Sequence, residues 1–150
     1  MAEYTIENEE LTLTVKASGA ELTSIKEKGT QVEYLWNADP AYWKRSSPIL
    51  FPIVGSLKNQ TYRYNGKNYS MSQHGFARDM EFRLKSASAI ELSFALEATD
   101  ETMKLYPFRF VLEVGYRLSG RRITVMWKVR NHDSKPMYFS IGGHPAFLCP

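Results

Sequence analysis

Apolar and polar residues alternate strictly over several stretches of this chain, and this pattern constrains the fold more than any other feature. Successive side chains of a β-strand point to opposite faces, so a period of two lets each stretch line one buried face of a sheet. The alternation predicts strands over residues 11–16, 90–97, 110–118 and 123–129. The sequence therefore predicts an all-β fold.

Turn residues separate these stretches at short intervals. Turn signals lie at Ser18-Gly19, Lys28-Gly29, Asn65-Gly66, Ser86–Ala89 and Ser119-Gly120-Arg121. Asn65-Gly66 supplies the positive φ angles that a type I′ hairpin requires. A further strand is expected over 22–26. Many short strands with closely spaced turns are typical of an antiparallel sandwich or barrel.

Four segments depart from the alternation. Single helical turns are expected over 40–44, with Asp39 as N-cap, and over 99–105. Residues 48–55 are apolar and contain two prolines, which cannot donate to a sheet ladder, so buried extended chain partly outside a sheet is expected. Residues 140–147 contain Gly-Gly, which permits a sharp turn or a close approach to a ligand.

Composition excludes several classes of function. The chain has 150 residues, which fits one domain over 1–150, and its net charge of +3 is scattered without a basic run, so no nucleic-acid partner is expected. No apolar stretch reaches the roughly 20 residues of a membrane helix. Cys149 is the single cysteine, and residues 1–10 lack the features of a secretion signal. A soluble cytoplasmic protein is the expectation.

Three histidines are candidates for proton transfer. His74 and His144 each lie beside glycine, whereas His132 lies in a polar stretch that is typical of a loop. A histidine beside glycine is more often a turn or hydrogen-bonding residue than a catalyst. Their spacing fits no metal site, and neither a nucleophile elbow nor a P-loop motif occurs, so no metal or nucleotide is expected.

Other side chains near these histidines are candidates for ligand contacts. The aromatic rings of Tyr42, Trp43, Phe76 and Phe147 could pack on the apolar face of a sugar ring, or they could belong to the core or its rim. Arg78 could donate a forked pair of hydrogen bonds to sugar hydroxyls, or it could pair with Asp79 or Glu81.

Four blocks give the sequence a resemblance to a known family. They are Pro48–Gly55, Gln73–Arg78, Tyr106–Phe108 and Ser140–Phe147, in this order across nearly the whole chain. Together they resemble the N-terminal half of an aldose 1-epimerase, in particular of the bacterial LacX-type branch. The resemblance implies a galactose mutarotase-like antiparallel supersandwich. It also implies interconversion of the α and β anomers of an aldose, with no cofactor.

The resemblance also implies roles for individual residues. His144 matches the family histidine that protonates the ring oxygen, and His74 matches a second histidine that binds the sugar beside it. Arg78 is a candidate for sugar binding. Ser56 stands where many family members have an arginine that contacts the sugar, and Lys58 is a candidate to take its place. Such a histidine and carboxylate pair suits ring opening, which moves one proton on and another off.

The expected base lies outside this sequence. Family domains are about twice as long, and their catalytic glutamate is expected beyond residue 150, so the chain is expected to be part of a longer protein and inactive alone. Glu81, Glu91, Glu97 and Glu113 are expected to face solvent. A hexose-6-phosphate 1-epimerase is an alternative, with phosphate candidates Lys44, Arg45, Lys58 and Arg78. A non-catalytic carbohydrate-binding module and a structural sandwich without a ligand are the others.

Overall fold

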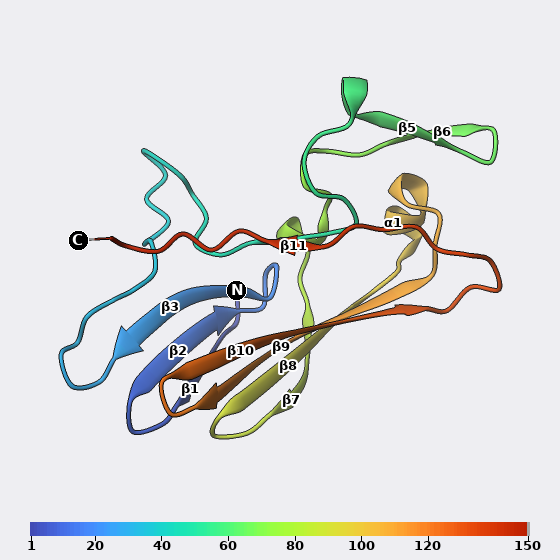
Figure 1. Cartoon of the computed structure of the whole chain (residues 1–150). Coiled ribbons are helices and arrows are strands. Elements are labelled where there is room, and N and C mark those ends of the chain that lie inside the picture. Colours follow the sequence, from blue (N-terminus) through green and yellow to red (C-terminus); the bar gives the residue numbers. More distant parts are fainter. Residues whose placement is uncertain (150) are drawn as a thin grey trace.

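The computed structural model describes residues 1–149, and its strands form two antiparallel sheets that pack face to face (Figure 1). The first sheet has the order β1-β2-β3 and the second the order β10-β9-β8-β7. The bounds are β1 Glu3–Glu7, β2 Leu11–Lys16, β3 Glu21–Glu27, β7 Arg83–Ala87, β8 Glu91–Glu97, β9 Phe110–Ser119 and β10 Arg122–Asn131. The predicted all-β antiparallel fold is confirmed.

The alternating residues build the core between these sheets. Leu11, Leu13 and Val15 of β2 are buried, and the residues between them are only partly so. On the second sheet, β8 and β9 contribute Leu92, Phe94, Leu112, Val114 and Tyr116. The hydroxyl of buried Tyr116 donates a 2.6 Å hydrogen bond to the carbonyl of Ala20, which ties the second sheet to the chain that enters β3.

A separate hairpin stands away from the two sheets (Figure 1). It consists of β5 (Thr61–Tyr64) and β6 (Lys67–Ser70), and its turn residues Asn65 and Gly66 have φ angles of 48° and 79°. Both angles are positive, as predicted for a type I′ turn. The short helix α1 (Asp100–Leu105) lies beside the hairpin, where the Tyr62 hydroxyl donates to the carbonyl of Leu105.

The helical expectations are met unequally. Thr99 caps α1 in a capping box with Thr102, as the sequence predicts. Residues 40–44 instead form a single turn, in which the amide of Trp43 donates to the carbonyl of Asp39. Two short 3-10 turns complete the helical elements of residues 1–149, η1 (Lys58–Gln60) and η2 (Ala77–Asp79). Among the same residues, no helix has the length and apolarity needed to cross a membrane.

Two strands were not predicted, and one turn is displaced. β1 and β7 are edge strands with few apolar residues, so the period of two is weak in both. β7 continues through Ala87, and the expected turn over Ser86–Ala89 therefore begins later, at Ser88.

The two irregular segments lie side by side. β4 (Ile49–Leu50) pairs with β11 (Gly142–Gly143), and the amides of Ser140 and His144 extend the ladder to the carbonyls of Pro52 and Pro48. Residues 48–52 are buried extended chain, as expected, whereas Val54 is half exposed. The glycines of β11 make no turn. Instead, a Cβ on Gly143 would lie 3.2 Å from the ring of Trp127, so close packing is the reason for a glycine there.

Candidate functional site

The backbone of the loop that carries His74 has an unusual conformation. His74 and Gly75 have φ angles of 62° and 74°, a region that few residues other than glycine adopt. A Cβ on Gly75 would lie 2.1 Å from the carbonyl oxygen of Phe51, so only glycine fits there. That same oxygen accepts the amides of Phe76 and Ala77. The loop is thus anchored on the apolar 48–55 segment.

His74 is joined to Gly55 by two hydrogen bonds. Its backbone amide donates to the Gly55 carbonyl at 2.8 Å, and its ring Nδ1 accepts the Gly55 amide at 2.9 Å. Since Nδ1 is an acceptor, the neutral ring carries its proton on Nε2. Burial, then Arg78 and His144, lower the pKa of His74 below its ordinary value. At neutral pH, His74 is therefore an uncharged hydrogen-bond donor.

His144 follows β11 on the C-terminal segment. Its backbone amide donates to the Pro48 carbonyl at 3.1 Å. Its side chain is exposed, and its ring lies 4.8 Å from the ring of Trp43, centroid to centroid, at a tilt of 46°. His144 thus has one face supported by an aromatic side chain and access to solvent.

The structure brings the two candidate histidines together from distant parts of the sequence. The rings of His74 and His144 lie 6.5 Å apart, centroid to centroid, in an edge-to-face arrangement. The distance is short enough for both rings to contact one bound sugar. His132, the third histidine, follows β10 on the surface, where its amide donates to the carbonyl of Arg109.

The loop that holds Trp43 depends on residues that the sequence did not single out. The indole nitrogen of Trp36 donates to the Trp43 carbonyl at 2.7 Å, and the Asp39 carboxylate accepts the amide of Ala41. Gly55 and Pro48, which bond the two histidines, also contribute through backbone atoms. Backbone partners leave no side-chain signal, although the placement of Gly55 in the first conserved-looking block of the resemblance was a usable hint.

Arg78 lies beside His74, and its guanidinium group is already engaged. One Nη donates to the Gln73 carbonyl at 2.9 Å, and Nε lies 4.0 Å from the Asp79 carboxylate. Arg45 makes the closer ion pair with Asp79, at 2.6 Å. Burial and the neighbouring Arg45 lower the pKa of Arg78. Its Nε is buried without a hydrogen-bond partner, so this arginine has a donor to spare.

The remaining candidates differ in their surroundings. Ser56 is exposed directly after Gly55, and Lys58 is exposed at the start of η1. Phe76 is buried and packs on Tyr106 and Phe110, so it belongs to the core. Tyr42 and Phe147 are exposed.

The acidic residues named from the sequence lie elsewhere. Glu91, Glu97 and Glu113 lie on β8 and β9 and pair with Arg117, Arg83 and Lys85, and Glu81 is exposed. Within residues 1–149, no group of three or more histidine, cysteine, aspartate or glutamate side chains could hold a metal ion.

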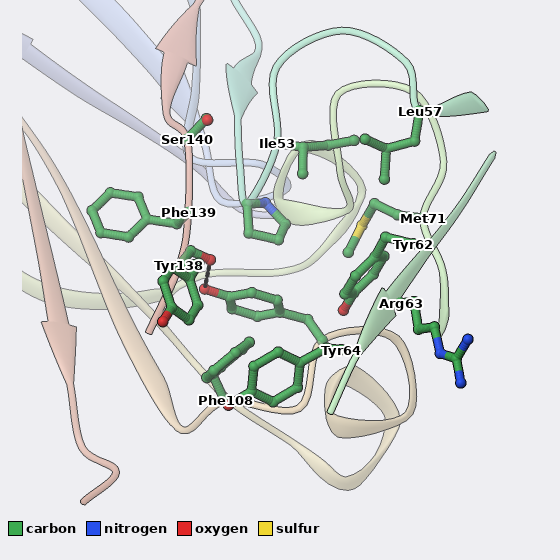
Figure 2. A pocket seen from close by; sticks show the side chains of 12 residues that line it. Ile53, Leu57, Tyr62, Arg63, Tyr64, Met71, Phe108, Tyr138, Phe139 and Ser140 are labelled. Carbon is green, nitrogen blue, oxygen red and sulfur yellow. Dashed lines mark hydrogen bonds between the residues drawn. The ribbon is translucent and has the colours of Figure 1, made fainter. Parts of the chain in front are cut away.

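A cavity of about 400 Å³ lies away from the histidines, between the β5–β6 hairpin and residues 138–140 (Figure 2). Aromatic rings of Tyr64, Phe108 and Tyr138 gather on one side of it, and Arg63 points away. The Tyr106 hydroxyl donates to the Tyr138 carbonyl at 2.8 Å. Neither candidate histidine lines this cavity.

Comparisons with known proteins support one family. The model of the aldose 1-epimerase family matches residues 2–150. The chain is 41% identical to the protein LacX of Lactococcus lactis, over 97% of this chain and 50% of that protein. It is 31% identical to an Escherichia coli protein provisionally named a glucose-6-phosphate 1-epimerase, over 69% of this chain and 37% of that protein.

A solved structure agrees. A galactose mutarotase related enzyme from Lactobacillus acidophilus superposes with a TM-score of 0.98 and 41% identity, over 99% of this chain and 50% of that chain. This chain therefore spans about half the length of the relatives it matches. With the family model covering almost every residue, and two thirds of the chain and more shared with relatives above 30% identity, the chain belongs to the aldose 1-epimerase family.

Proposed function

We propose that this chain forms the histidine-bearing part of a carbohydrate-binding mutarotase, which interconverts the α and β anomers of an aldose by acid and base catalysis. One observation carries the proposal, namely the 6.5 Å approach of His74 and His144. The two rings come from separate loops, and each loop is held by backbone hydrogen bonds. Such convergence of two titratable rings is the arrangement that proton transfer to a small substrate requires.

In the proposed reaction, His144 donates a proton to the ring oxygen while the bond between C1 and that oxygen breaks. A base removes the proton from the anomeric hydroxyl, and C1 becomes an aldehyde carbon. Rotation about the C1–C2 bond and reclosure, with the proton transfers reversed, give the other anomer. The base is expected to be a glutamate beyond residue 150, as the family resemblance implies.

His74 would hold the sugar rather than exchange protons. With Nδ1 bonded to the Gly55 amide and its pKa lowered, the ring presents a neutral Nε2–H donor. A neutral donor can bind a sugar oxygen over a wide pH range. Arg78 is the candidate for a second donor through its unpartnered Nε, and exposed Ser56 lies next to Gly55.

Polarimetry tests this proposal. We would join this chain, in place of its matching half, to the remainder of Lactococcus lactis LacX, and follow freshly dissolved α-glucose and α-galactose. The chimera should accelerate mutarotation, and its His144→Ala variant should lose most of the acceleration. His132→Ala, which removes an exposed histidine outside the pair, should leave the rate unchanged. A folded chimera that binds these sugars without accelerating mutarotation would instead establish a non-catalytic binding module.

A sugar phosphate is the second candidate substrate, because two guanidinium groups lie side by side near His74. Arg45 and Arg78 share a single close carboxylate, Asp79, so positive charge is in excess there. The similarity to the Escherichia coli protein points the same way. Faster turnover of α-glucose 6-phosphate than of α-glucose by the chimera, with the preference lost in Arg45→Gln, would select this alternative. Equal turnover of both sugars would exclude it.

A further inference from the structure

One face of β10 is apolar but only partly covered. Ile123, Val125, Trp127 and Val129 point to the core side of the sheet, opposite Leu118, Tyr116, Val114 and Leu112 of β9. The β9 residues are at most 1% exposed, whereas Val125 and Trp127 are 45% and 41% exposed. The layer that covers β9 therefore stops short of its neighbour.

The uncovered face forms one wall of an apolar trough. A cavity of about 360 Å³ separates β10 from the C-terminal segment and β3. Phe147, on the opposite wall, is 59% exposed. Large apolar side chains that gather on one face, rather than scattering singly, mark an interaction surface.

The outer edge of β10 is also free within residues 1–149. This strand of ten residues pairs with β9 only. The other sheet-edge strands, β1, β3 and β7, are shorter, with five, seven and five residues. Native proteins keep free edges short, charged or covered, so a long edge bordering an apolar trough indicates a missing neighbour.

The relatives indicate what that neighbour is. This chain keeps the conformation of the matched half of a structure twice its length, with a TM-score of 0.98. The unmatched half of such a protein must pack on some surface of this fold. We propose that the trough and the free edge of β10 bind the polypeptide corresponding to that unmatched half, with a strand added to β10 and apolar side chains inserted between Trp127 and Phe147. This inference does not depend on the proposed activity.

The proposal predicts how the chain behaves with and without that polypeptide. Alone, it should enhance the fluorescence of 1-anilinonaphthalene-8-sulfonate and exchange the outward amides of β10 rapidly. In the LacX chimera, the fluorescence should fall and these amides should exchange about tenfold more slowly or more. Val125→Glu should reduce the thermal stability of the chimera. Ile90→Glu, at an exposed apolar residue in the turn before β8, should not.

Two results would overturn this inference. One is a chain that alone shows neither dye binding nor rapid exchange of β10, with no change in the chimera. The other is a chain that sediments as a dimer which Val125→Glu dissociates, since a second copy would then be the occupant. If the chimera cannot be purified, hydrogen exchange and sedimentation of the chain alone still decide between a free face, a dimer and a face that needs no cover.

Discussion

At the scale of single residues, His74 links site chemistry to stability. Its lowered pKa means that the folded state disfavours the charged ring, so the stability it contributes is present above the ordinary pKa of about 6.5 and is lost as pH falls through the lower folded value. His74→Asn keeps an acceptor and a residue type that tolerates positive φ, but cannot titrate. We expect urea unfolding between about pH 8 and about pH 5 to show a smaller loss of stability in this variant than in the wild type. An equal loss in both would show that His74 does not contribute.

Gly75 gives a second prediction at this scale. Gly75→Ala would place a methyl group against the Phe51 carbonyl and force an unfavourable φ, and the loop would have to move, at a cost of about 3 kcal/mol or more. Gly66→Ala is the matched control, since its φ is also positive but nothing lies within 4 Å, so only about 1–2 kcal/mol is expected. Chemical denaturation measures both. Similar losses would show that the close approach to Phe51 costs nothing.

At the scale of elements, a buried carboxylate connects β3 to the segment that carries β4. Glu21 is fully buried, pairs with Lys16 at 2.7 Å, and accepts the amides of Ser46 and Ser47. These amides directly precede Pro48, whose carbonyl holds His144. Glu21 therefore positions the segment that supports the candidate site.

Glu21→Gln should destabilise the protein by about 1–3 kcal/mol, because Lys16 loses its partner but keeps some contact with water. It should also shift the ring resonances of His144 in NMR spectra. Glu97→Gln breaks an exposed pair with Arg83 and should change stability by less than about 1 kcal/mol, without moving those resonances. Unmoved His144 resonances in both variants would contradict the positioning role.

The elements also show how far sequence patterns reach. Alternation located β2, β8, β9 and β10, because their buried faces require it. It missed β1 and β7, whose solvated edges allow polar residues at almost every position. The candidate histidines were named from the sequence, but their contact was not, since a ring distance depends on how two distant loops are anchored. The close packing of Gly143 on Trp127 was likewise invisible, as no periodicity encodes it.

At the scale of the whole molecule, the two sheets should unfold together. Tyr116→Phe removes the buried hydrogen bond to Ala20 and leaves that carbonyl unpaired, at a cost of about 1–2 kcal/mol. Hydrogen exchange should then accelerate in both sheets. Tyr62→Phe, which removes the bond to Leu105, should accelerate exchange in the β5–β6 hairpin and α1 alone. Acceleration confined to one sheet in Tyr116→Phe would show that the sheets open independently.

The pairing of β4 with β11 has a consequence for the order of folding. It joins Ile49–Leu50 to Gly142–Gly143, across most of the chain, whereas the hairpins β1–β2, β5–β6 and β9–β10 join near neighbours. Closing a long loop loses more chain entropy, so this contact is expected to form late, after the rate-limiting step. Changes around His144 should then alter mainly the rate of unfolding, and the catalytic histidines would meet only once the sandwich beneath them is already built.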